Sequence, residues 1–170
     1  MSTSTPQTAR SFARGSAAVS GLRIVNTAAE THPLFIRLTG EFMPQLKAAQ
    51  LRLKAALPNA TISVFSESVG AATSFNGAHL GIECLLPQVA DDQPDNVAFT
   101  ITLCHLDRQP RLAADVCWGH PSGHVEASLS GQDGSSDRWP VAHNERIDEL
   151  VEKAPQLLHA FEQAAQRGHP

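Results

Sequence analysis

Three segments decide the fold of this chain: VAFTITLCHL (97–106), RLAADVCW (111–118) and HVEASLS (124–130). In each of them, apolar side chains alternate with polar or small ones. Alternation with a period of two is typical of β-strands that have one buried and one solvent-facing side. Turn-rich segments separate the three, so we expect three consecutive antiparallel strands that form a meander.

The sequence before this meander predicts two more strands and one helix. TISVFSES (61–68) and HLGIECLLP (79–87) have the strand pattern. An apolar stripe runs from Phe42 to Leu57 at helical spacing. Pro44 is acceptable in the first turn of a helix but poorly placed in its interior, so we expect this helix to span 40–57.

The sequence after the meander predicts a polar linker and a C-terminal helix. The linker spans 131–140 and contains Trp139. Asn144 is a good N-cap, and an apolar stripe from Ile147 to Phe161 follows it at helical spacing. Pro155 interrupts this stripe, which predicts a kink or a helix in two pieces.

The order of these elements predicts an α+β fold. An antiparallel meander sheet of about five strands is expected to pack against an N-terminal and a C-terminal helix. Residues 1–21, rich in Ser, Thr and Ala, are predicted to be a flexible tail, and residues 22–170 a single domain. Because only two helices are available, we expect one face of the sheet to be open to solvent or to a partner.

The turns of the meander predict which residues pair on that open face. The first turn would place Thr102 opposite Asp115. The second turn would place Asp115 opposite Glu126 and Cys117 opposite His124. The open face would then carry Thr100, Thr102, Arg111, Asp115, Cys117, His124, Glu126 and Ser128.

Composition and charge argue against some classes of partner. The formal net charge is −4, and the 13 Lys and Arg residues form no basic cluster. Nucleic acids and anionic membranes favour basic surfaces, so neither is expected as the main partner. The three cysteines are an odd and widely spaced set, which favours a reducing compartment and hence a cytoplasmic protein.

The pattern Cys117-x-x-His120-x-x-x-His124 is the sharpest candidate for chemistry. Thiolate and imidazole groups at such spacings resemble zinc ligands. The alternative is that Gly-His-Pro-Ser-Gly (119–123) is a hairpin turn and Cys117 a half-buried thiol. We favour the turn, expect no cofactor, and keep the zinc site as an alternative.

Two catalytic arrangements can be drawn with the same residues. Cys117 activated by His124, with Asp115 or Glu126 nearby, would make a thiol nucleophile, although a flat sheet face supplies no oxyanion hole. Asp115 and Glu126 would form an acid–base pair if close and partly buried, but a solvated charge pair is commoner on a sheet face. Because P-loop, dinucleotide, HExxH and GxSxG motifs are missing, an enzyme is the less favoured class.

The sequence therefore favours a non-enzymatic, bacterial-type accessory protein that binds another protein through the open sheet face, such as a secretion chaperone, adaptor or immunity protein. Its binding residues would be Arg111, Asp115, His124, Glu126 and Trp139, because arginine and aromatic side chains often anchor interfaces. The alternatives are a small-molecule pocket between sheet and helices, or the zinc-binding turn. An exposed edge strand would also allow a homodimer.

Overall fold

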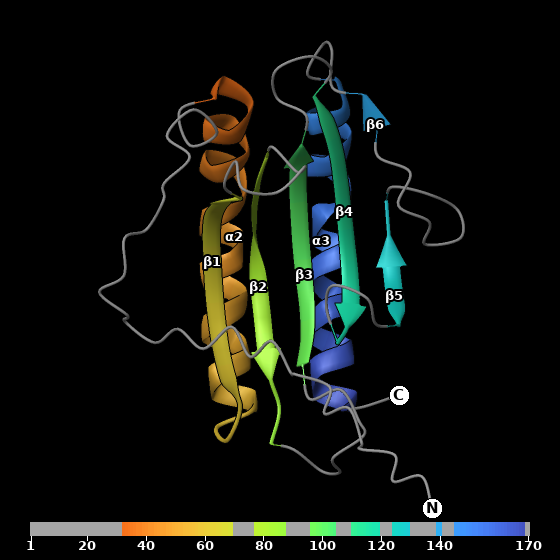
Figure 1. The fold of residues 1–170 in the computed structure, drawn as a ribbon. Coiled ribbons are helices and arrows are strands. Elements are labelled where there is room, and N and C mark those ends of the chain that lie inside the picture. Colours follow the sequence, from red (N-terminus) through yellow and green to blue (C-terminus); the bar gives the residue numbers. More distant parts are fainter. Residues whose placement is uncertain are drawn as a thin grey trace, which may run out of the picture.

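A computed structural model describes residues 32–69, 77–87, 96–104, 110–119, 124–129, 139–140 and 145–168 (Figure 1). The strands form one antiparallel sheet in the order β1-β2-β3-β4-β5, and a short strand β6 also pairs with β4. In chain order the elements are α2 (Pro33–Ala56), β1 (Thr61–Val69), β2 (Gly77–Leu85), β3 (Asn96–Cys104), β4 (Arg111–Trp118), β5 (Val125–Ser128), β6 (Trp139–Pro140) and α3 (Glu145–Arg167).

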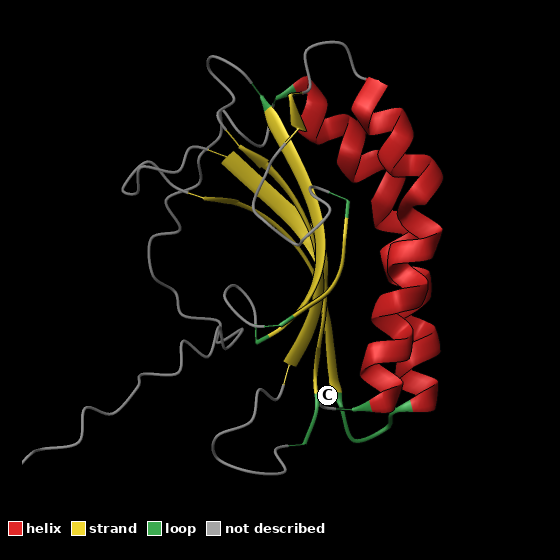
Figure 2. Ribbon diagram, turned by 90° about the vertical axis from the view of Figure 1, so that its right-hand side faces the viewer, coloured by secondary structure: helices red, strands yellow, loops and turns green. Residues whose placement is uncertain are grey.

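Both described helices lie on one face of the sheet, which we call the inner face; the opposite one is the outer face (Figure 2). The apolar strand positions point inward and form a single core with the two helices. Phe42, Phe99 and Trp118 are among its largest fully buried side chains. The predicted α+β meander, with one helix before it and one after it, is therefore confirmed.

Helix α2 begins earlier than predicted, at Pro33 instead of Gly40, and Pro44 lies in its interior. Phe35 and Leu38 extend the apolar stripe toward the N-terminus, and they are only 4% and 0% exposed. Burial of each such side chain contributes about 1.5–3 kcal/mol. Together they offset the cost of about 3 kcal/mol that an interior proline imposes on a helix.

Helix α3 continues over Pro155 as one element. Of the two predicted alternatives, a kink or a helix in two pieces, the second is therefore wrong. The apolar stripe explains this continuity, because Leu150 and Ala154 before the proline and Phe161 after it all lie in the same core. Pro155 itself is exposed on the solvent side of the helix. The predicted N-cap, Asn144, lies outside the described residues.

The segment predicted as a polar linker ends in a strand. Trp139 and Pro140 form β6, in which Trp139 is the backbone partner of Leu112 and Pro140 that of Arg111. Strand β5 pairs only with the other end of β4, between Asp115 and Cys117. The edge of β4 near its start is therefore available, and β6 pairs with it.

The pairing of β3 with β4 is shifted by two residues from the prediction. Thr100, and not Thr102, is opposite Asp115, and Cys104 is opposite Arg111. The connection between the two strands is therefore two residues longer than a four-residue turn at 107–110. A shift of two residues keeps every side chain on its expected face, because the side-chain period of a strand is also two.

A β-bulge changes the register within the pairing of β4 with β5, so this pairing differs from the prediction in more than a uniform shift. Asp115 is opposite Ser128 and Cys117 is opposite Val125, with a register shift between Val116 and Cys117. The predicted pairs of Asp115 with Glu126 and of Cys117 with His124 are therefore wrong. A bulge places one extra residue in a strand, and here that residue is Glu126.

The two helices run parallel to each other, and ion pairs join them near both ends. Arg37 and Asp148 pair near the start of each helix. Arg52 and Glu162 pair farther along, with 2.5 Å between Nη2 and Oε1. Exposed pairs of this kind contribute little stability, about 0–1 kcal/mol each, so the common core is the main link between the helices.

Candidate functional site

The outer face is the first candidate site, because neither α2 nor α3 covers it. Cross-strand pairing places one row of residues across its middle, and in that row Asp115 Oδ1 accepts a hydrogen bond from Ser128 Oγ over 2.6 Å. A Cβ atom on Gly81 would lie 2.8 Å from Phe65 Cζ, so the ring of Phe65 lies against this glycine. From β1 to β5 the row reads Phe65, Gly81, Thr100, Asp115 and Ser128.

The centre of the outer face is not the solvent-exposed plane that alternation predicts. Ala98 and Thr100 are 3% exposed, Ala113 is 4% exposed and Cys117 is 7% exposed. Arg111, Asp115 and Ser128 are more exposed than this centre, as are Thr102 and Val125.

A second polar pair lies on the outer face at the other side of the sheet. His79 Nε2 is 2.7 Å from Glu67 Oε1, and the two residues are direct cross-strand partners. The ring of Phe65 meets the imidazole edge-on, with 5.7 Å between centroids. His79 is only 8% exposed. The sequence signal for this position is alternation: Leu80 and Ile82 point inward, so His79 lies on the outer face.

Thr100 carries a buried hydroxyl that has no hydrogen-bond partner among the residues that the structure describes. The residue lies in the middle strand of the sheet, between Gly81 and Asp115. A buried polar group without a partner costs about 1–3 kcal/mol. The Thr100 hydroxyl at the centre of the outer face therefore lowers the stability of the fold.

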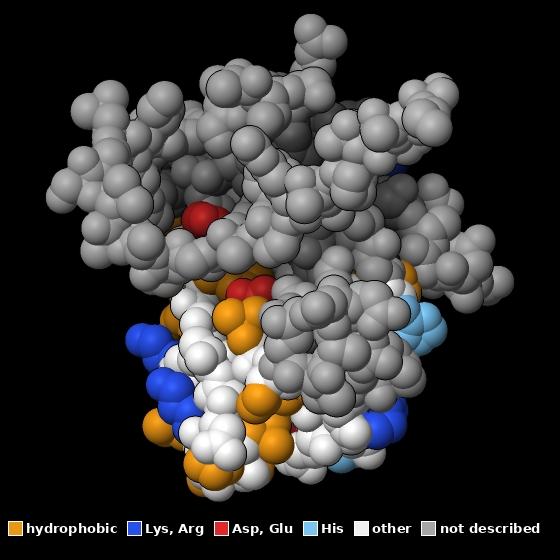
Figure 3. Space-filling view, turned by 60° about the horizontal axis from the view of Figure 1, so that its bottom comes forward, with side chains coloured by type: hydrophobic (Ala, Val, Ile, Leu, Met, Phe, Trp, Pro, Cys, Tyr) orange, Lys and Arg blue, Asp and Glu red, His pale blue; other side chains and the backbone are white. Residues whose placement is uncertain are grey.

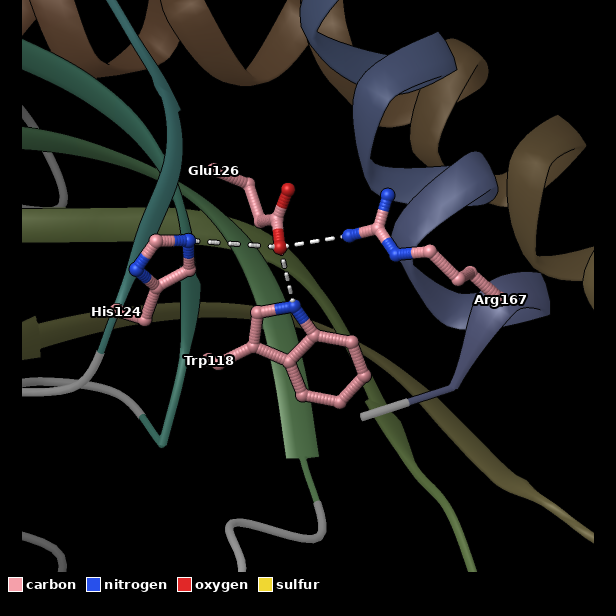
Figure 4. Close-up of polar contacts among 4 residues, drawn as sticks. All are labelled: Trp118, His124, Glu126 and Arg167. Carbon is pink, nitrogen blue, oxygen red and sulfur yellow. Dashed lines mark hydrogen bonds and ion pairs between the residues drawn. The ribbon is translucent and has the colours of Figure 1, made fainter. Parts of the chain in front are cut away.

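Glu126 contacts the other three residues of a second candidate site, at the edge of the inner face (Figure 4). Its Oε1 atom accepts the indole N–H of Trp118 over 2.8 Å and Arg167 Nη2 over 2.7 Å. His124 Nε2 lies 3.8 Å from the same oxygen. The bulge turns Glu126 to the side of α3, so its predicted place on the open face is wrong. The contact of Arg167 with Glu126 was not predicted from the sequence, because the two residues are 41 positions apart in the chain.

The residues proposed for chemistry from the sequence do not come together. Cys117 lies on the outer face, whereas the imidazole of His124 is directed toward Glu126 near the inner face. Burial, with the nearby Asp115 charge, raises the pKa of the Cys117 thiol to about 11, so it is not an activated nucleophile at neutral pH. Asp115 and Glu126 likewise face opposite sides of the sheet.

The zinc alternative gains no support from the described part of the chain. His120 lies outside the described residues, and Cys117 and His124 diverge. Among the residues that the structure describes, no group of three or more His, Cys, Asp or Glu side chains is arranged to hold a metal ion. Trp139 is placed by its backbone in β6, and its side chain lies outside the described part.

Neither α2 nor α3 combines the length and the apolar character that a membrane-spanning helix needs. No protein-family model, curated protein or solved structure gives a significant match to this chain.

Proposed function

We propose that this chain is a non-enzymatic accessory protein that binds another protein through the outer face of its sheet. The observation that carries the proposal is the one-sided architecture, in which both described helices cover the inner face. A sheet face without a helix layer is a surface on which a partner can pack. The partner would be recognised by the more exposed side chains that surround the buried centre: Thr102, Arg111, Asp115, Val125 and Ser128.

The chemistry of this surface suits recognition better than catalysis. It offers one cation from Arg111, one carboxylate from Asp115, a hydroxyl from Ser128 and an apolar side chain from Val125. Protein interfaces combine these groups, with apolar contacts at the centre and polar ones at the rim. Burial raises the pKa of the Cys117 thiol to about 11, which disfavours a thiolate nucleophile on this face.

The space between sheet and helices supports the same preference. Leu80, Ile82, Phe99 and Ile101 of the strands are 0% exposed and fill this layer together with side chains of α2 and α3. A small-molecule pocket between sheet and helices would need a hollow there. Because side chains fill this layer, it does not favour a small-molecule site between sheet and helices.

The proposal is tested by capturing partners with the full chain and two outer-face variants, one that reverses a charge and one that introduces a charge. Arg111→Glu and Val125→Arg change the outer face, and Glu152→Arg changes an exposed position on α3 as the matched control. Immobilised proteins are incubated with a lysate of the native host, and bound proteins are identified by mass spectrometry. We expect a partner that the wild type and Glu152→Arg retain and that both outer-face variants lose by at least tenfold.

Thermal unfolding of all four proteins shows whether the variants are folded. The proposal is wrong if the retained partner binds Arg111→Glu and Val125→Arg as well as it binds the wild type. It is also wrong if Glu152→Arg alone loses the partner, because the binding surface would then lie on the helices.

A further inference from the structure

The centre of the outer face is buried, although no described helix lies over it. Thr100 is 3% exposed and Cys117 is 7% exposed. His79 carries a larger side chain and is still only 8% exposed. Both α2 and α3 pack on the inner face and shield nothing on this side (Figure 2). The burial of this centre therefore requires a cover from another part of the chain.

The internal connections of the chain are too short to provide that cover. Between four and nine residues lie outside the described ranges at each internal connection, and every connection is joined to described residues at both ends. Thr100 is the fifth of the nine residues of β3, so it lies about 14 Å from either end of that strand. A connection that reached Thr100 and returned would cover about 27 Å, which is nearly the full extended length of eight residues.

The N-terminal segment, residues 1–31, is long enough and is joined to the described part of the chain at one end only. It leads into α2 through His32, the N-cap of that helix. These 31 residues span at most about 100 Å, whereas a sheet of five strands is about 20 Å wide. Length therefore does not prevent this segment from reaching any part of the outer face.

The composition of the N-terminal segment is basic and partly apolar. Its three arginines are Arg10, Arg14 and Arg23. Glu30 is its only acidic residue. The stretch LRIVN (22–26) contains three large apolar side chains beside one of the arginines. Such a segment has apolar groups that gain from burial and cations that gain from nearby carboxylates.

Carboxylates are the main charged groups on the described part of the outer face. Cross-strand pairing places three of them there, against the single guanidinium of Arg111: Glu67, Glu83 and Asp115. Neutral donors orient two of these carboxylates, because Asn96 Nδ2 donates to Glu83 over 2.8 Å and Ser128 Oγ donates to Asp115. Figure 3 shows acidic side chains near the middle of the view and lysines and arginines at its sides. The charge of the outer face is thus complementary to that of residues 1–31.

We propose that residues 1–31 bind over the outer face of their own chain, with arginine side chains paired to the carboxylates of Glu67, Glu83 and Asp115, and so compete with the protein partner of this face. The competition rests on the function proposed above, whereas the covering of the face does not. A partner then binds by displacing the N-terminal segment, which lowers the apparent affinity of the full chain.

The native cysteines report on the cover without any added probe. Cys117 lies on the outer face, whereas Cys84 belongs to the core on the inner face. The full chain is treated with N-ethylmaleimide, and mass spectrometry follows the labelling of each cysteine over time. Displacement of a cover exposes Cys117 alone, whereas unfolding of the whole domain exposes both thiols. The ratio of the two rates therefore separates loss of the cover from loss of the fold.

Charge reversal in the N-terminal segment should displace it from the outer face. The double variant Arg14→Glu/Arg23→Glu places acidic side chains against the carboxylates of that face. Lys47→Glu/Lys54→Glu, at exposed positions of α2, changes the net charge by the same amount and is the matched control. We expect the N-terminal variant to label Cys117 at least tenfold faster than the wild type and the core cysteine at an unchanged rate. The control should change neither rate.

Cross-linking tests the position of the segment directly. The first lysine of the chain is Lys47, so Arg14→Lys/Arg23→Lys introduces lysine side chains into residues 1–31 without a change in net charge. A carbodiimide joins a lysine to a carboxylate that it contacts, and no spacer remains. We expect peptides from the monomeric chain in which position 14 or 23 is linked to an outer-face carboxylate. The wild type, treated in parallel, shows the background.

The covering is overturned if Arg14→Glu/Arg23→Glu labels Cys117 no faster than the wild type. It is also overturned if the introduced lysines link only to carboxylates of the helices, such as Glu152, or only to a second copy of the chain. Partner capture then tests the competition, for which we expect Arg14→Glu/Arg23→Glu to retain at least threefold more partner than the wild type. Equal retention by both chains would refute the competition, and a lack of any partner would refute the protein-binding function with it.

Discussion

Glu126 accepts the indole N–H of Trp118, and so the edge strand β5 is joined to the largest side chain of the core. The same carboxylate oxygen also accepts Arg167 of α3. One residue therefore connects the sheet edge, the core and the end of the last helix.

We expect Glu126→Ala to lower the free energy of unfolding by about 1–3 kcal/mol, because the buried indole N–H loses its acceptor. Arg167→Ala should cost less than about 1 kcal/mol, since its side chain is 52% exposed. Urea denaturation of both variants measures the difference. A double variant with Trp118→Phe should show less than additive loss. Equal effects of the two single variants would contradict the interpretation that the indole is the main partner.

Gly81 is required by the close approach of its neighbours. A Cβ atom there would lie 2.1 Å from the carbonyl oxygen of Phe99, which is backbone and cannot turn away. We expect Gly81→Ala to destabilise the fold by about 3 kcal/mol or more, at the upper end of overpacking effects. Gly40→Ala is the control, because its Cβ would meet nothing within 4 Å. This change should stabilise helix α2 by about 0.5–1 kcal/mol. Thermal unfolding that ranks the two variants in the opposite order would refute both assignments.

Thr100→Val tests the buried hydroxyl, for which the described part of the chain supplies no hydrogen-bond partner. The two side chains have the same shape, and the change removes the desolvation cost of the hydroxyl. We expect the free energy of unfolding to rise by about 1 kcal/mol. Thr102→Val, on the same strand and face but more exposed, should change it less. A clear loss of stability in Thr100→Val would mean that the hydroxyl makes a favourable contact in the folded chain.

Alkaline pH should destabilise the fold through its buried thiols. Burial raises the pKa of Cys84 and of Cys117 from 9.0 to about 11 in the folded chain. The unfolded chain therefore loses these protons first, and the free energy of unfolding falls as pH rises from about 9 to about 11. Below this window the thiols contribute no pH dependence. Urea denaturation between pH 8 and 11 measures the slope, which should be shallower in Cys117→Ser. Equal slopes for the wild type and Cys117→Ser would contradict the raised thiol pKa.

The faces of the strands could be predicted from the sequence because side-chain direction depends only on local alternation. Leu112, Ala114 and Val116 point inward as expected. This assignment survived even where the pairing partner was predicted incorrectly, since the β3–β4 register differs by an even number of residues. Local pattern therefore determined which residues reach the core.

The position of Glu126 could not be predicted in the same way. A bulge reverses the alternation at Glu126, and the side chain then meets Arg167 of α3, which is distant in the sequence. The start of α2 was missed for a related reason. Pro44 is unfavourable locally, but the burial of Phe35 and Leu38 against distant strands outweighs that local cost. Tertiary contacts decided both positions.

The placement of the two helices has a consequence for how the chain is made. Helix α2 packs on β1 and β2, whereas α3 packs on β3, β4 and β5. Synthesis proceeds from the N-terminus, so the strands leave the ribosome before residues 145–167 do. Until then, Phe99 and Trp118 of the nascent chain lack the helix that buries them. During this stage of synthesis the sheet is covered by α2 alone and exposes apolar surface. Aggregation or chaperone binding then competes with the completion of folding.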